Sequence, residues 1–222
     1  METTIHPPIG AVTACARCGE CCKRYAISVL PDELEVEARF LKLDPRAFTL
    51  LYTKLLVQIM PFSSANHPLA LHTSMIPKPI WEKLKAAGFD AQYAMILPML
   101  GFKKEEYCVF FDPKSFGCTI HPVKPKQCRL FPFTSLKDNE DYSKAYDFCE
   151  LAAITSPTAH TKTEQDSQKQ KLRNYFDAVG EKGLERVWKY LPAEGDLIYP
   201  GYFTQKITLD ELKQLLSTAK EK

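Results

Sequence analysis

The chain has 222 residues, of which 45% are hydrophobic, so it can bury a core without covalent cross-links. Its 29 basic and 27 acidic residues nearly cancel, which excludes a charge-based argument for nucleic acid as a partner. The longest apolar stretch, near residues 94–100, is much shorter than the ~20 residues that span a bilayer, so we expect no membrane segment.

The first 14 residues have neither a basic start nor a continuous apolar run, so we expect no secretory signal. We therefore expect a cytoplasmic protein. The cytosol keeps thiols reduced, so the eight cysteines need a role other than disulfides. Four disulfides remain the alternative, because the number of cysteines is even.

Hydrophobic spacing and proline positions predict the elements of the first half of the chain. Pro31 suits the first turn of a helix, and the two acidic residues after it favour the positive end of the helix dipole. Apolar residues at helical spacing predict a second amphipathic helix that stops before Pro61. In chain order we expect a short strand at 25–30, helices at 31–44 and 48–59, an irregular connection at 61–79 and a short helix at 81–87.

Two apolar segments joined by a turn predict a β-hairpin in the second half of the chain. Residues 155–170 are polar and contain no cysteine. Thr208 and Glu211 form the capping box of a last amphipathic helix. We expect strands at 107–112 and 118–120, a loop at 121–125, a helical turn at 126–130, helices at 164–179 and 181–190, and a loop at 192–206.

Four cysteines occur within eight residues near the start of the chain: Cys15, Cys18, Cys21 and Cys22. Two residues between thiolates let a tight turn direct both sulfurs at one metal ion, as in zinc sites. The repeated C-x2-C-x2-C spacing also resembles the run that binds an iron–sulfur cluster in bacterial ferredoxins. Gly19 favours either kind of site, because a backbone that turns around a metal often needs a residue without Cβ. The adjacent Cys21 and Cys22 suit two different centres better than one tetrahedral ion.

The other four cysteines are spread over the later part of the chain: Cys108, Cys118, Cys128 and Cys149. Cys108 and Cys118 lie on opposite arms of the predicted hairpin, which can bring their sulfurs together. Eight thiolates complete two four-ligand sites that hold either 4Fe–4S clusters or zinc. The alternative for one or two of them, Cys149 above all, is a buried thiol that only fills the core.

Basic residues flank both cysteine groups and can offset the negative charge of a thiolate-bound centre. Arg129 is the cofactor-binding residue that we expect, because it directly follows Cys128 within an apolar stretch. His121, three residues after Cys118, is more consistent with an ordinary hydrogen bond than with metal ligation. Nothing singles out one cysteine as a nucleophile, so a thiol hydrolase is not favoured.

The N-terminal C-x2-C-x2-C-C run resembles that of the YkgJ-like CxxCxxCC cysteine-cluster family, which is described as zinc- or iron-chelating. The segment 118–132, CTIHPVKPKQCRLFP, is similar to the second signature of this family, with His121 in place of a commoner tyrosine and Lys124 in place of a commoner arginine. The resemblance covers about residues 15–150, and Cys149 fits the last cysteine of the family. One branch resembles the flagellin lysine N-methylases, which implies S-adenosylmethionine as a second cofactor.

We predict an α+β fold, mainly helical with a small β-hairpin and organised around one or two cysteine-ligated metal centres. Residues 1–155 form the cysteine-cluster metal-binding domain and 156–222 a helical C-terminal extension. The preferred function is metal binding through iron–sulfur clusters or zinc, with iron–sulfur favoured by the triple spacing.

Two alternative functions stay open. One is a protein-lysine N-methyltransferase that uses S-adenosylmethionine, although no G-x-G-x-x-G or Walker motif independently supports a nucleotide or methyl-donor site. The other is a metal-stabilised interaction module that binds a protein partner through an apolar surface on residues 160–222. Whether the protein is an enzyme is left open by the sequence.

Overall fold

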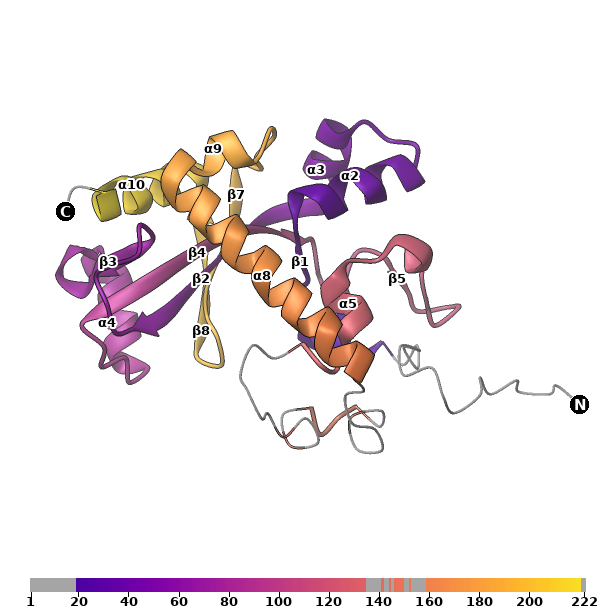
Figure 1. Ribbon diagram of the computed structural model, residues 1–222, viewed down its shortest axis with the longest axis horizontal. Coiled ribbons are helices and arrows are strands. Elements are labelled where there is room, and N and C mark those ends of the chain that lie inside the picture. Colours follow the sequence, from indigo (N-terminus) through magenta and orange to yellow (C-terminus); the bar gives the residue numbers. More distant parts are fainter. Residues whose placement is uncertain are drawn as a thin grey trace, which may run out of the picture.

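A six-stranded mixed β-sheet forms the centre of the protein (Figure 1). This computed structural model describes residues 19–134, 141, 144, 146–149, 152 and 159–220. The strand order is β1–β4–β2–β7–β8, and β3 also pairs with β4; β2 and β7 run parallel, and the other neighbours run antiparallel. The strands are β1 (Ser28–Val29), β2 (Thr53–Phe62), β3 (Ala70–His72), β4 (Tyr93–Phe102), β7 (Glu194–Tyr199) and β8 (Phe203–Thr208).

Helices pack around this sheet, and α8 crosses it diagonally in Figure 1. Helix α10 lies next to β3 and β8, and α5 packs against α8. In the described part of the chain, no helix has the length and apolar character needed to cross a membrane. The helices are α1 (Glu20–Arg24), α2 (Pro31–Phe40), α3 (Pro45–Tyr52), η1 (Thr73–Met75), α4 (Lys78–Ala86), η2 (His121–Val123), α5 (Lys126–Leu130), α8 (Ala159–Lys182), α9 (Leu184–Val187) and α10 (Leu209–Lys220).

A second, two-stranded sheet pairs β5 (Phe111–Asp112) with β6 (Gly117–Cys118). The main core lies against the large sheet, whose strands β2 and β4 pair over ten residues each. On one face of β2, Leu55, Val57 and Ile59 are at most 1% exposed. Burying one side chain of this size is worth about 1.5–3 kcal/mol, so these two strands are a major source of stability.

The predicted helix over 48–59 is wrong in its second half. Helix α3 ends at Tyr52, and β2 begins at Thr53. Leu51 is 56% exposed whereas Leu55 is 1% exposed, so the two do not lie on one buried helix face. A strand buried on both faces is a continuous apolar run, and its spacing cannot be distinguished from that of a buried helix.

Strand β4 contains Pro98 at its centre, although proline normally argues against an internal strand position. Here β3 pairs with the first residues of β4 and β1 with the last, so Pro98 faces a gap between them. Its carbonyl accepts a hydrogen bond from the Tyr175 hydroxyl of α8 at 2.8 Å. The loop predicted over 192–206 is also wrong, because β7 and β8 form a hairpin there that turns at Gly201, where φ is +82°.

The predicted fold, mainly helical and organised around cysteine-ligated centres, is therefore wrong, because the mixed sheet organises the chain. The small hairpin and helices α2 and α4 are confirmed. The capping box of α10 is also confirmed: the Glu211 amide donates to Thr208 Oγ1, and the Thr208 amide donates to the Glu211 carboxylate. The predicted domain boundary at residue 155 lies outside the described residues, and β7 and β8 join the same sheet as β2.

An ion pair joins the parallel strands β2 and β7. Asp196 is 7% exposed and accepts hydrogen bonds from Lys54 on β2 and from Lys206 on β8, the latter at 3.0 Å. Burial raises the pKa of the Asp196 carboxyl, but the two lysines outweigh it, and the net shift is downward. The pair ties the C-terminal strands to the centre of the sheet.

Replacing Asp196 with asparagine is expected to lower the free energy of unfolding by about 1–3 kcal/mol near neutral pH, because two hydrogen bonds lose their charged acceptor. The pKa of Asp196 is lower in the folded state than its unfolded value of 3.8. The stability that the ionised carboxylate contributes is therefore fully present above pH 3.8, and it is lost as the pH falls through the pKa of the folded state. Urea unfolding at about pH 7 and about pH 3 measures the change. Glu194→Gln, an exposed change on the same strand, is the control, and equal losses in both variants would contradict the prediction.

Candidate metal centre

Helix α1 carries Cys21 and Cys22 and follows Gly19. Gly19 has a φ of +78°, in the left-handed region that favours glycine, and its carbonyl accepts a hydrogen bond from the Lys23 amide at 2.9 Å. The sequence therefore uses glycine where the backbone turns into the cysteine helix. The other two cysteines of the N-terminal run, at positions 15 and 18, lie outside the described residues.

The ring of Phe111 packs directly on Gly19. A Cβ at position 19 would lie 2.4 Å from this ring, far inside van der Waals contact. Phe111 begins β5 and stacks on Tyr107, with ring centroids 5.0 Å apart. Gly19 is thus the point where the N-terminal cysteine segment meets the segment that carries Cys108 and Cys118.

Main-chain hydrogen bonds connect three of the cysteine-bearing segments. The Cys108 amide donates to the carbonyl of Cys22 at 2.9 Å. The Cys108 carbonyl accepts from the Phe111 amide at 2.8 Å, and Phe111 pairs with Cys118 across the β5–β6 hairpin. Cys22, Cys108 and Cys118 therefore lie in adjacent backbone segments although they are far apart in the sequence.

Two side chains hold helix α5, which carries Cys128. Ser28 of β1 donates to Gln127 Oε1 through its amide at 2.8 Å and through its hydroxyl at 2.7 Å. The Glu33 carboxylate accepts from the Lys126 amide at 2.7 Å and also caps the first turn of α2, so one carboxylate closes the N-termini of two helices. These contacts fix Cys128 relative to the edge of the sheet and to α2.

Aromatic rings hold the backbone of Cys149 near the end of α1. The ring centroid of Tyr25 lies 5.9 Å from those of Tyr146 and Phe148. The guanidinium of Arg24 lies over the Phe148 ring, 4.5 Å from its centroid. Cys149 follows Phe148 and is buried, so its backbone lies near the end of α1.

Four thiols influence one another's titration: those of Cys21, Cys108, Cys118 and Cys128. Burial raises the pKa of Cys128 well above its usual value, and the other three thiols add to the rise. Burial likewise raises the pKa of Cys108 to about 11. The pKa of Cys21 is raised first by its hydrogen bond with Cys22 and then by burial. Buried thiolates repel one another, and a bound cation removes that cost.

These thiols do not form a finished cage around one ion. Among the residues that the structure describes, no three His, Cys, Asp or Glu side chains gather closely enough to hold a metal. The six described cysteines are all free thiols. The predicted set of eight cysteine ligands therefore stays a prediction, although the structure brings the segments of the described members together.

A comparison with protein families matches residues 14–150 to a family model described as "CxxCxxCC: Putative zinc- or iron-chelating domain". The chain belongs to this family. The match includes all eight cysteines and supports metal binding as the general function of this CxxCxxCC protein. Searches of curated proteins and of solved structures find no match.

Lys124 is a buried cation that acts on the thiols of this CxxCxxCC protein. It is 7% exposed and lowers the pKa of both Cys21 and Cys128. Its Nζ lies 3.4 Å from Nε2 of His121. Arg129, which we expected to contact the cofactor, donates from Nε to the carbonyl of Lys124 at 2.8 Å, and its contact with a cofactor stays a prediction.

A buried carboxylate that the sequence pattern did not single out lies beside the same thiols. Glu37 of α2 is fully buried, and neither of its side-chain oxygens has a hydrogen-bond partner among the described residues. Burial raises the pKa of Glu37 to about 9; Glu33 adds to the rise, and Arg129 opposes it. The charge of Glu37 in turn raises the pKa of Cys108. An unpartnered carboxylate beside thiols fits a site that a cation completes.

A signal for Glu37 does exist in the sequence. It lies three residues after Leu34 and four before Leu41, on the apolar face that predicted helix α2. A carboxylate among apolar positions is worth noting, because an unpaired charge is rarely buried.

Gly19→Ala is expected to reduce the metal content of the purified protein, because the added methyl group displaces the ring of Phe111. Gly88→Ala is the matched control, since Gly88 has a φ of +79° and open space around it. Both changes add about 1–2 kcal/mol of left-handed backbone strain, so only the difference between them reports the packing. Elemental analysis per chain is the measurement, and equal metal content in the two variants would show that this contact is not required.

Glu37 is expected to make the protein less stable as pH rises. Between its ordinary value of 4.5 and about 9, the folded state keeps a proton that the unfolded state has lost. The free energy of unfolding therefore falls by about 1.4 kcal/mol for each pH unit in this window. Glu37→Gln removes this dependence, so the variant becomes progressively more stable than the wild type as pH rises.

Urea unfolding between about pH 5 and about pH 9 measures this difference. Glu35→Gln, an exposed change on the same helix, serves as the control and should follow the wild type. A constant gap between wild type and Glu37→Gln across the range would contradict the prediction.

Proposed function

We propose that this CxxCxxCC protein binds an iron–sulfur cluster through four of its cysteines: Cys21, Cys108, Cys118 and Cys128. The observation that carries the proposal is the main-chain connection between the cysteine segments, through the hydrogen bond from Cys108 to Cys22 and the pairing of Phe111 with Cys118. These contacts do not use the sulfur atoms, so the thiols stay available as ligands.

The C-x2-C-x2-C spacing of the N-terminal cysteines favours a cluster over a single ion. Zinc binds four protein ligands at about 2.0–2.3 Å, so four sulfurs must converge on one point. A 4Fe–4S cluster is bound by four cysteines, each on a different iron, so its ligands stand further apart. The described thiols influence one another's pKa values, which supports a shared centre.

The remaining cysteines, Cys15, Cys18, Cys22 and Cys149, are assigned to a second centre. Cys21 and Cys22 are consecutive residues of α1, and consecutive side chains on a helix point about 100° apart, which favours different centres for the two. The aromatic contacts that hold Cys149 near the end of α1 support its place in the same group.

The charges around the thiols support a dianionic centre. An oxidised 4Fe–4S cluster with four thiolates carries a formal charge of about −2, and a buried site needs a cation to offset it. Lys124 supplies such a charge, because it is buried and acts on Cys21 and Cys128. Glu37 lies near Cys108, and because burial raises its pKa to about 9 it stays protonated at neutral pH and adds no negative charge there.

No feature of the described residues favours the two other functions considered from the sequence. Methyl transfer with S-adenosylmethionine and protein docking through residues 160–222 both stay predictions. The proposal therefore concerns the metal centre alone and assigns no reaction to it.

Cys128→Ser is expected to remove iron and acid-labile sulfide together and to abolish the broad visible absorption of the cluster, because one of four iron ligands is lost. The measurement is anaerobic purification followed by an absorption spectrum and elemental analysis. Ala219→Ser places the same hydroxyl at a buried position on α10, away from the cysteines, and is the matched control. It should keep the iron content of the wild type.

The same preparation also distinguishes an iron–sulfur cluster from zinc and tests whether Cys128 is a ligand. A colourless wild-type protein with stoichiometric zinc would overturn the iron–sulfur assignment and leave cysteine ligation intact. Full iron and sulfide content in Cys128→Ser would remove this residue from the ligand set.

A further inference from the structure

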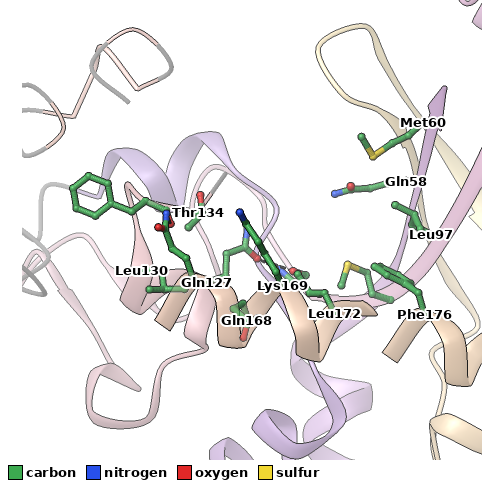
Figure 2. Close-up of a pocket in the computed structure, with 14 residues that line it drawn as sticks. Gln58, Met60, Leu97, Gln127, Leu130, Thr134, Gln168, Lys169, Leu172 and Phe176 are labelled. Carbon is green, nitrogen blue, oxygen red and sulfur yellow. Dashed lines mark hydrogen bonds between the residues drawn. The ribbon is translucent and has the colours of Figure 1, made fainter. Parts of the chain in front are cut away.

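A cavity with several lysines in its lining lies where β2 begins and β4 ends, next to the start of β7. Its volume is about 450 Å³, within the roughly 300–1,000 Å³ of small-molecule sites. The cavity between the sheet and α8 in Figure 2, by contrast, is lined mostly by apolar side chains and amides. The charged residues that line the first cavity are Lys54, Lys103, Lys104, Lys206, Glu105 and Glu194.

Two of the four lysines share one carboxylate. Lys54 and Lys206 both donate to Asp196, the ion pair that joins β2 and β7. Asp196 holds the two ammonium groups in place beside the cavity, but its single charge offsets only one of theirs. This side of the cavity therefore keeps a positive charge.

The other two lysines have no acidic partner in the part of the chain that the structure describes. Lys103 instead donates from Nζ to the carbonyl of Leu50 at 2.6 Å, and Leu50 also lines the cavity. Lys104 is half-buried; burial lowers its pKa, and the charge of Lys54 lowers it further. Lys54 and Lys104 thus lie within electrostatic reach of each other, and an anion between them offsets their repulsion.

The two glutamates restrict which anion fits. Glu105 and Glu194 are exposed and form no ion pair with another described residue. Their charges repel a ligand that is negative along its whole length, such as a polyphosphate. A carboxylate does accept hydrogen bonds from hydroxyl groups. The lining therefore suits a ligand with its charge at one end and hydroxyl groups on the rest.

We propose that this cavity binds a small phosphate monoester whose body carries hydroxyl groups, the chemistry of a sugar phosphate. The phosphate binds Lys103 and Lys104, whose two charges match its charge of about −2. The hydroxyl groups donate to Glu105 and Glu194. No described cysteine lines the cavity, so this site is separate from the cysteine ligands and does not depend on which metal they hold.

Isothermal titration calorimetry of the full chain, as purified with its metal, tests the proposal with glucose 6-phosphate as the probe. Two matched probes change one feature each: glucuronate keeps a sugar ring but carries a carboxylate, and inorganic phosphate lacks the hydroxyl-bearing body. Each is expected to bind about tenfold more weakly than glucose 6-phosphate, the effect of losing one directed polar contact. Equal affinity of either probe and glucose 6-phosphate would overturn the proposal.

Two variants locate the site. Lys103→Gln and Lys104→Gln are each expected to weaken binding of glucose 6-phosphate about tenfold, because each removes one charged partner of the phosphate. Lys162→Gln changes an exposed lysine of α8 outside the cavity and should bind like the wild type. No binding by the wild type at about 10 mM probe, or unchanged binding in both cavity variants, would overturn the proposal. The probe series uses only wild-type protein, so it decides the question even where a variant loses its metal.

Discussion

Strands β2 and β4 pair along their whole length, and the position of the cysteine site follows from that pairing. Strand β1 pairs with the end of β4, with Ser28 opposite Gly101. Ser28 in turn binds Gln127, the residue before Cys128. Each step uses backbone or amide hydrogen bonds, which are directional and fix distances closely. The sheet thus determines where helix α5 and its cysteine lie.

Sequence features at the ends of elements, such as a proline, a capping box or a turn, predicted those elements correctly. Pro31 opens α2 as expected, Thr208 and Glu211 cap α10, and a turn closes the hairpin before Cys118. The secondary structure of other segments depends on tertiary contacts. The segment that becomes β2 is largely apolar and follows a helix without a break, so its spacing fits both kinds of element. Strand β4 accommodates Pro98 because neighbouring strands leave a gap beside it, which no local rule anticipates.

The cysteine spacing was sufficient to predict the family and metal binding as its general function. The charged residues around the thiols were harder to predict. Lys124 lies between two prolines in a segment expected to be a loop, yet it is buried. Glu37 and Lys124 come from different elements and meet the thiols only after the chain has folded. Whether a charged side chain is buried depends on all the segments around it. The flanking sequence alone therefore indicated Arg129, and not Lys124, as the residue beside the cofactor.

Helix α5 has five residues, and two consecutive ones make different contacts. Gln127 accepts two hydrogen bonds from Ser28 of β1, whereas the thiol of Cys128 lies within electrostatic reach of three other cysteines. A single short helix moves as a unit, so a displacement caused at one residue is transmitted to the next. Thermodynamic linkage then requires reciprocity: whatever free energy metal binding at Cys128 adds to the contact between Gln127 and Ser28, that contact adds to metal binding. Five residues of backbone would be enough to couple occupancy of the cysteines to the edge of the sheet.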